Sequence, residues 1–195
     1  MATDKNGKII LSTECKTAFR RAQHVERYVA RLIEFLYKVK LVEITEGKFS
    51  EYDIKFVYPD GGILTVEVKE DLKCAKSGNV VLEIGHVDKP SGLMVTKADI
   101  YVYIIHRKDG SWGTYLQSTD GMRMLRKSYD DITTEYMGDG KDEGEGVFCC
   151  LYKYDRFVRD LALIDDSSYY FDNPERAIRM RPCRQLKRLV HQHTT

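Results

Sequence analysis

The sequence predicts one α/β domain in which helices flank a mixed β-sheet built from hairpins. A long helical periodicity opens the 195-residue chain, and two pairs of strand-like segments, each joined by turn residues, follow it. The length suits one well-formed core and is short for two independent ones. With 43% hydrophobic and 31% charged residues, the composition is that of an ordinary soluble globular protein. We therefore expect a single domain over residues 1–195.

The first element expected is a helix that begins at Ser12 or Thr13 and runs to about Lys40. Its apolar residues recur at helical spacing, and Arg and Lys lie on the opposite side. The apolar stripe consists of Phe19, Ala22, Val25, Val29, Leu32, Ile33 and Leu36. This pattern predicts a helix that packs by one face against the sheet.

Two hairpins should supply most of the sheet. Residues 52–58 and 63–69 are rich in β-branched and aromatic side chains, and the segment between them reads Pro-Asp-Gly-Gly. Residues 100–106 and 112–116 form a second such pair around an Asp-Gly turn. Between the hairpins we expect a short strand over 79–84 and then a helical turn near 91–99, which would form the crossing helix of the domain.

The core is expected to cover about residues 12–117, and residues 118–195 to form an extension. Four segments of this extension have a clear local pattern. They are a helix over 118–130, a strand over 147–154, a helix over 155–164 and a basic helix over 173–191. The stretch 138–146 alternates glycine with acidic residues, which is typical of a flexible loop.

The net charge of +1 conceals an uneven distribution. Residues 1–40 carry nine Lys or Arg against four acids, residues 129–146 seven acids against one lysine, and residues 171–195 six basic groups against two acids. A basic face that follows a nucleic-acid backbone is compatible with this pattern. Solvated helix faces and a loose tail explain the charge equally well.

Several classes of protein are disfavoured by composition. No segment approaches the ~20 apolar residues of a membrane span, and the polar N-terminus does not have the apolar region of a signal peptide. The five cysteines contain no C-x-x-C pair, which argues against a structural zinc site and for reduced thiols. We expect a cytoplasmic protein with no membrane partner.

One charged pattern has a setting that its rivals do not have. Glu67 and Lys69 end a strand and share one face of it, while Val66 and Val68 point to the other. Asp53 lies on the preceding strand. The other acid-x-lysine pairs lie in a helix, in loops, beyond the strand or on a strand with no earlier acid: Glu14/Lys16, Glu46/Lys48, Asp139/Lys141, Asp71/Lys73 and Asp53/Lys55. From spacing alone, a functional trio and a salt-bridged sheet surface remain equally open.

The register of the first hairpin decides whether Asp53 joins Glu67 and Lys69. Directly opposed residues of antiparallel strands share a face. If Pro59 opposes Ile63, or if any register of the same parity holds, Asp53 lies on the face of Glu67 and Lys69. A slip of one residue would turn Asp53 toward the valines, where an unpaired carboxylate is costly. Burial cost therefore predicts the register that gathers the three charges.

The sequence also resembles a known family. The Asp-bearing strand is followed by Val-Glu-Val-Lys-Glu-Asp at 66–71, by a segment at 76–83 and by another at 89–101. This order looks like the restriction-endonuclease-like core of the PD-(D/E)xK nuclease superfamily, and the segments are similar to phage-type or resolvase-like members. The resemblance covers roughly residues 20–106. One departure is that Tyr52, rather than proline, precedes Asp53.

The resemblance implies an endonuclease that depends on a divalent metal and hydrolyses phosphodiester bonds in duplex or branched DNA. Its catalytic residues would be Asp53, Glu67 and Lys69. The metal ligands would be the carboxylates of Asp53 and Glu67 and the backbone carbonyl of Val68, a set that suits Mg²⁺, with Mn²⁺ as an alternative. The metal would activate a water, and Lys69 would orient that water or offset charge on the phosphate.

Glu26 is a further candidate ligand. It lies within the apolar stripe of the first helix, where an unpaired carboxylate is costly. Resolvases of branched DNA in this superfamily add a helical glutamate to the metal site, which implies the same role for Glu26, with Glu34 as a weaker substitute. A boundary residue that reaches solvent or pairs with Arg27 or Arg31 explains Glu26 almost as well.

Contacts with nucleic acid are expected on two segments after the Glu67 strand. The candidates are polar or basic residues able to hold phosphate. They are Lys73, Lys76, Ser77, Asn79, Ser91, Thr96 and Lys97. An ordinary polar loop is the competing explanation for the first four, and the last three would cap or line the crossing helix. The basic tail could bind nucleic acid, form a dimer contact or be disordered.

Two other functions remain open at this stage. One is a nucleic-acid-binding protein with the same fold and no catalysis, in which the charged trio is structural. The other is a ribonuclease with the same metal site, because the groove that selects RNA is not visible in a sequence. A symmetric homodimer would be natural if both strands must be cut. If the protein is viral, the expected location is the host cytoplasm.

Overall fold

The computed structural model describes residues 13–45, 51–86, 89–127, 133–138 and 146–167. Its strands are β1 (Lys40–Ile44), β2 (Ile54–Val57), β3 (Ile63–Asp71), β4 (Asn79–His86), β5 (Lys89–Pro90), β6 (Ile100–His106), β7 (Trp112–Ser118), β8 (Thr133–Gly138), β9 (Gly146–Lys153) and β10 (Ala162–Ser167). Its helices are α1 (Thr13–Tyr37), α2 (Cys74–Ser77), α3 (Thr119–Lys127) and α4 (Tyr154–Phe157), and its 3-10 turns are η1 (Gly92–Met94) and η2 (Val158–Asp160).

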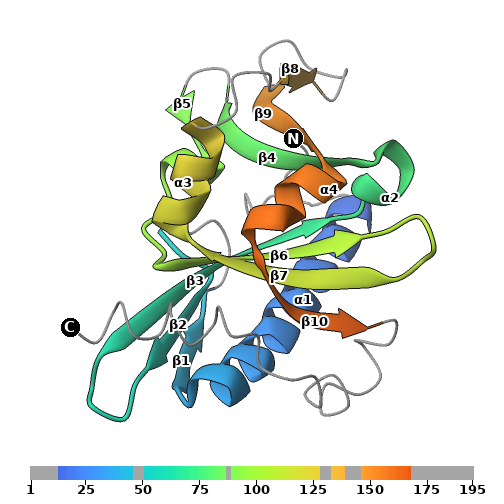
Figure 1. Ribbon diagram of the computed structural model, residues 1–195. Coiled ribbons are helices and arrows are strands. Elements are labelled where there is room, and N and C mark those ends of the chain that lie inside the picture. The colour runs from blue at the N-terminus through green and yellow to red at the C-terminus, as the bar shows by residue number, and fades with distance from the viewer. Residues whose placement is uncertain (1–12, 46–50, 87–88, 128–132, 139–145, 168–195) are drawn as a thin grey trace, which may run out of the picture.

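The strands form two sheets. A mixed six-stranded sheet has the order β1-β2-β3-β6-β7-β10, and a four-stranded antiparallel sheet has the order β5-β4-β9-β8. Only β3 and β6 pair in parallel within the described residues. Helix α1 covers one face of the larger sheet, and the smaller sheet lies with α3 and α4 on the other side (Figure 1). The predicted mixed α/β fold class is confirmed.

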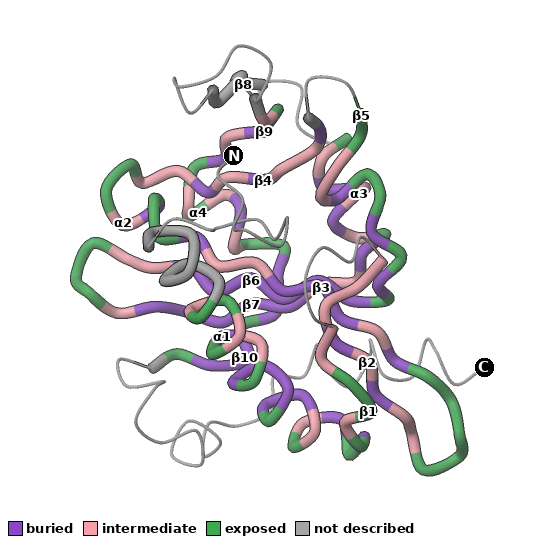
Figure 2. The backbone as a smooth tube through the Cα atoms, turned by 180° about the vertical axis from the view of Figure 1, so that it is seen from behind, coloured by how far each residue is buried: buried purple, intermediate pink, exposed green. Residues whose placement is uncertain are grey.

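Two apolar cores lie on opposite faces of the larger sheet. Val66, Val68 and Val102 pack with α1 in the first core, and Tyr101 and Tyr103 pack toward the smaller sheet in the second. The central strands are accordingly buried along most of their length (Figure 2). Because side chains alternate along a strand, the face of β3 that carries Glu67 and Lys69 is the one turned toward the smaller sheet.

Helix α1 ends earlier than expected. Val25, Val29 and Ile33 are buried, as the apolar stripe predicts. The helix stops at Tyr37 and not near Lys40, because Lys38 adopts a left-handed conformation with φ 58°. A left-handed residue commonly ends a helix, although glycine is its usual occupant. The next residues form β1, a strand that the sequence did not indicate.

The first hairpin has the predicted parity in a different register. Val57 opposes Ile63, and Ile54 opposes Val66. The pairing is thus two residues away from the one in which Pro59 opposes Ile63. A shift of two residues leaves every side chain on its face, so Asp53 is aligned with Glu67 and not with Lys69.

The helical turn expected near 91–99 is present as η1, but it does not extend into a crossing helix. The chain leaves β3 through α2, adds β4 and β5 to the smaller sheet, and returns through the single turn η1. Gly92 has φ +52°, and a Cβ atom there would lie 2.6 Å from the Glu83 carbonyl oxygen. This close approach to β4 requires a residue without a side chain at position 92. The short strand expected over 79–84 is present as part of β4.

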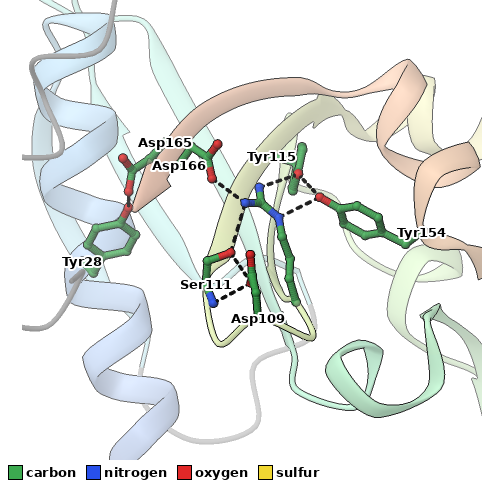
Figure 3. A network of polar contacts seen from close by, with 8 residues as sticks. Tyr28, Asp109, Ser111, Tyr115, Tyr154, Asp165 and Asp166 are labelled. Carbon is green, nitrogen blue, oxygen red and sulfur yellow. Dashed lines mark hydrogen bonds and ion pairs between the residues drawn. The ribbon is translucent and has the colours of Figure 1, made fainter. Parts of the chain in front are cut away.

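The C-terminal expectations are confirmed in part. Helix α3 and strand β9 occupy the predicted segments, but the helix expected over 155–164 ends after α4 and η2, and β10 follows. Ala162 and Ile164 are buried while Leu163 is exposed, which is the two-residue alternation of a strand. Asp165 of β10 accepts a hydrogen bond from Tyr28 of α1 (Figure 3). The tail helix over 173–191 and the loop residues 139–145 lie outside the described residues.

No helix in the described part of the chain is long and apolar enough to cross a membrane.

Asp71 fastens the two sheets together where β3 ends. Its side chain is 6% exposed and accepts hydrogen bonds from the backbone N–H groups of Cys74 at 2.9 Å and Val81 at 2.8 Å. Asp71→Ala should lower the free energy of unfolding by about 3 kcal/mol, because it leaves two donors without a charged acceptor. Chemical denaturation would measure the loss.

A matched control for Asp71 is Asp109, which accepts comparable bonds from Ser111 on an exposed turn. Asp109→Ala should cost much less than Asp71→Ala, because water replaces the lost acceptor. Equal losses for the two variants would contradict the role assigned to Asp71.

Candidate active site

The site is built at an unpaired edge of β3. Asp53 donates its backbone N–H to the Val66 carbonyl at 2.9 Å, and Val68 donates its N–H to Oδ2 of Asp53 at 2.7 Å. Beyond Val66, no described strand pairs with this edge. The N–H and C=O of one strand residue point to the same side. The Val68 carbonyl is therefore directed to the edge at which the Asp53 carboxylate lies.

Glu67 and Lys69 form an ion pair on the adjoining face of β3. Nζ of Lys69 lies 2.8 Å from Oε1 of Glu67, and the Thr96 hydroxyl lies 3.0 Å from Oε2. Burial alone would lower the pKa of Lys69, but the carboxylates of Glu67 and Asp53 outweigh it and raise that pKa above its usual value. The neighbouring carboxylates thus favour the charged form of Lys69.

The carboxylates outnumber the ammonium group beside them. Burial, and next the charge of Glu67, raises the pKa of Asp53 to about 6. Burial, and next the charge of Asp53, raises the pKa of Glu26 to about 7, although Lys69 acts in the opposite direction. Such shifts mark a place where negative charge accumulates at low solvent exposure. A cation bound there would relieve the repulsion.

The donor set fits a hard divalent cation. Among the described residues, no three side chains of His, Cys, Asp or Glu are grouped so as to hold a metal ion by themselves. The predicted set differs, because it combines the carboxylates of Asp53 and Glu67 with the Val68 carbonyl. Mg²⁺ typically uses one or two protein carboxylates and keeps several waters. Glu26 lies near enough for its pKa to respond to both carboxylates.

Two cavities open along the same stretch of β3. The larger, of about 550 Å³, lies between β3 and the smaller sheet and is lined by Lys69, Lys73 and Glu83 among others. The smaller, of about 260 Å³, lies toward α1 and is lined by Glu26 and Val68 among others. Glu70 and Leu72 line both cavities. Of the Asp53–Glu67–Lys69 group, only Lys69 is among the lining residues of these two cavities, and the larger of them has room for a ligand.

The residues expected to contact nucleic acid fall into different environments. Lys73 and Lys76 are exposed, and Lys73 lines the larger cavity. Ser77 closes the loop on itself, because its hydroxyl lies 3.1 Å from the carbonyls of Lys73 and Asn79 and accepts the Asn79 N–H at 3.0 Å. Of these four residues, Lys73, Lys76 and Ser77 are exposed, and Asn79 is half-buried.

The later candidates are engaged with carboxylates. Thr96 is 2% exposed, so it reaches Glu67 and not a phosphate, which corrects the expected contact. Ser91 donates its hydroxyl to Oε1 of Glu83 at 2.5 Å. Lys97 pairs with Glu51. Thr96 and Ser91 therefore contact carboxylates and do not line a helix beside the site. Lys97 forms its ion pair at an exposed position.

Glu83 is a site residue that the sequence reasoning missed. It lines the larger cavity together with Lys69, and its charge contributes to the raised pKa of that lysine. Alternation along β4, where Val80 and Leu82 are buried, could have indicated that Glu83 faces the other side. Which surface that side meets depends on the pairing of the two sheets, which no local pattern reveals.

No family model, curated protein or solved structure matches the chain. A function is therefore inferred from the fold and the site. Together they define a mixed α/β protein with a carboxylate–lysine site at the unpaired edge of a central strand.

The raised pKa of Asp53 makes a prediction about stability. A carboxyl group whose pKa is higher in the folded state costs nothing below about pH 4 and destabilises the fold once it ionises, so its cost is complete above about pH 6. In EDTA at about pH 8, Asp53→Asn should raise the free energy of unfolding by about 2 kcal/mol, because the amide oxygen still accepts the Val68 N–H and the repulsion is gone.

Thermal or denaturant unfolding at about pH 8 and about pH 4 would test this. The gain should be much smaller at the lower pH, where Asp53 is protonated in the folded state and only about half ionised in the unfolded chain. A gain of the same size at both values would show that repulsion is not its cause. Asp60→Asn, a change in an exposed turn of the same hairpin, should leave stability nearly unchanged at either pH.

Proposed function

We propose that the protein is a divalent-metal-dependent endonuclease of the PD-(D/E)xK type that hydrolyses phosphodiester bonds in DNA. The observation that carries the proposal is the position of Asp53, bonded to the Val68 N–H at an unpaired strand edge, next to the Glu67–Lys69 pair. Two carboxylates, a backbone carbonyl and a charged lysine side chain together suit phosphodiester hydrolysis with one metal ion.

The chain's own residues would share the chemistry as follows. A divalent cation held by Asp53, Glu67 and the Val68 carbonyl would supply Lewis acidity toward phosphate and water. Lys69 would place a positive charge where negative charge develops on the phosphate. Glu67 orients Lys69 through the 2.8 Å ion pair, and Thr96 restrains the other oxygen of Glu67.

The larger cavity offers a place for the substrate backbone. It extends from Lys69 to Lys73 along the end of β3. Lysine contacts to phosphate give affinity without sequence preference. DNA as the substrate is thus supported by the cleft and by the exposed lysines beside it.

A digestion panel tests the proposal. Linear duplex, single-stranded, nicked and four-way-junction DNA, together with RNA, would be incubated with Mg²⁺ or Mn²⁺ and with EDTA. The expected result is cleavage of at least one DNA form that requires the metal. Nucleic acid bound in EDTA but never cut would favour a non-catalytic binding protein, and cleavage of RNA alone would favour a ribonuclease.

A further inference from the structure

A third cavity lies where both sheets end, and three basic side chains contribute to its lining. Its volume is about 390 Å³, and its walls come from α2 and Gly78, from the turn between β6 and β7, and from the junction of β9 with α4. Figure 1 shows α2 and the β6–β7 turn at the same end of the molecule. The charged residues of its lining are Arg107, Lys108, Lys153 and Asp155. Cavities of this size accommodate small ligands or parts of larger ones.

Arg107 is oriented mostly by neutral groups. Its guanidinium donates to the hydroxyls of Tyr154 at 2.8 Å, Tyr115 at 3.0 Å and Ser111 at 3.3 Å, and to the Asp166 carboxylate at 2.6 Å. Figure 3 shows these four partners gathered round one point, with the two phenols in contact at 2.5 Å. Hydroxyl acceptors fix the direction of a guanidinium without cancelling its charge, whereas the Asp166 carboxylate offsets part of that charge. Arg107 is therefore a preorganised cation.

Lys108 and Lys153 add charge at the cavity mouth. The Lys108 ammonium lies 4.0 Å from the position that a Cβ atom would take on Gly78. Burial, and next the charge of Asp71, raises the pKa of the Cys74 thiol to about 11, and Lys108 opposes that rise, which indicates that its charge acts on the cavity wall. Three cations face Asp155 and, through Arg107, Asp166, so the cavity has an excess of positive charge.

This third cavity adjoins, along the chain, the larger of the two cavities that open along β3. Lys73 lines the larger cavity described above, and Cys74, the next residue, lines this one. The loop that leaves β3 is thus the boundary between them. A nucleic-acid strand that leaves the cleft past Lys73 would meet the cluster of Arg107, Lys108 and Lys153.

We propose that this basic cavity binds a backbone phosphate of the nucleic acid outside the catalytic centre. The ligand class rests on the proposed function, whereas the excess of positive charge and the oriented guanidinium do not depend on it. Arginine held in a fixed plane is well suited to phosphate oxygens, and flanking lysines add attraction that is independent of sequence.

The test is a binding measurement that needs no cleavage. Anisotropy of a short labelled DNA duplex would be followed in EDTA at several salt concentrations, for the wild type and for Lys108→Gln/Lys153→Gln. We expect affinity to fall about tenfold at low salt, and the slope of log K against log [salt] to become shallower by about 2, because about one counterion is released per phosphate contact.

Matched controls separate this site from general electrostatics. Lys40→Gln/Lys127→Gln removes the same charge from two exposed lysines elsewhere, and it should leave affinity and slope nearly unchanged. All four positions are exposed, so the variants should fold as the wild type does. Equal losses in both double variants, or no loss in Lys108→Gln/Lys153→Gln, would overturn the proposal.

Competition binding and cleavage measurements distinguish the remaining outcomes. If inorganic phosphate or a mononucleotide binds the wild type but not Lys108→Gln/Lys153→Gln, while both bind DNA equally, the cavity holds a free phosphate compound and the proposal fails. If the double variant loses DNA binding and no protein cuts DNA, this site stands and the nuclease proposal fails. A wild type that binds no nucleic acid overturns both.

Discussion

Glu67→Gln is expected to lower the rate of DNA cleavage by about 10³-fold or more, since a loss of about 4 kcal/mol of transition-state stabilisation corresponds to that factor. Glutamine retains the size of the side chain and an oxygen for the Thr96 hydroxyl. It has no negative charge for a divalent cation or for Lys69, which lies 2.8 Å away in the wild type. Single-turnover cleavage with Mg²⁺ and Mn²⁺ would measure the effect.

The fold of the Glu67→Gln variant should survive, because β3 remains paired with β6 through backbone bonds. Glu43→Gln on β1 is a suitable control, since Glu43 is exposed and accepts a hydrogen bond from Tyr52. That control should cleave as the wild type does. A Glu67→Gln protein that cleaves within tenfold of the wild type would refute the metal site.

Lys69→Met should have an effect of similar size on cleavage, also about 10³-fold, because the charge that offsets the developing phosphate charge is lost. Methionine preserves the apolar stem that passes along β3. The raised pKa of Lys69 predicts a further property of the wild type. Its cleavage rate should show no ionisation of this lysine near neutral pH, so a more alkaline buffer should not mimic the variant.

Lys55→Met is the natural comparison for Lys69→Met. Lys55 has the same spacing from an acid, Asp53, but it lies on β2 opposite Thr65. Its loss should change cleavage by less than about threefold, since no bond or developing charge of the site depends on it. Similar losses in the two variants would show that total charge matters, and that the position of Lys69 does not.

The face on which the three charges meet could be predicted from sequence, because alternation and burial cost act on every residue of β3. Val66 and Val68 must enter the core, so Glu67 and Lys69 must point away from it, and a parity that sent Asp53 toward the valines would be penalised. The exact partner could not be predicted, because registers that differ by two residues satisfy the same alternation. Asp53 therefore lies opposite Glu67 and not Lys69.

Other features depend on contacts between distant segments. The residues over 91–99 have no local feature that forbids a helix, yet Gly92 is pressed against the Glu83 carbonyl and the chain makes a single turn. The three apolar residues of Ala162–Ile164 fit the period of a helix as well as that of a strand, and pairing with β7 decides for a strand. Arg107 and Tyr154 are 47 positions apart, so the local sequence around neither residue predicts their contact.

The unpaired edge of β3 also bears on self-association of the protein through strand pairing. An exposed strand edge offers free N–H and C=O groups to a strand of another copy and is a common starting point for aggregation. Asp53 occupies the Val68 N–H at 2.7 Å and brings a carboxylate to the place where such a strand would add. The carboxylate proposed to bind the metal thus also occupies the backbone N–H group that a pairing strand would need. Asp53→Ala would remove both the carboxylate and its hydrogen bond to the Val68 N–H, whereas Asp53→Asn would keep the hydrogen bond.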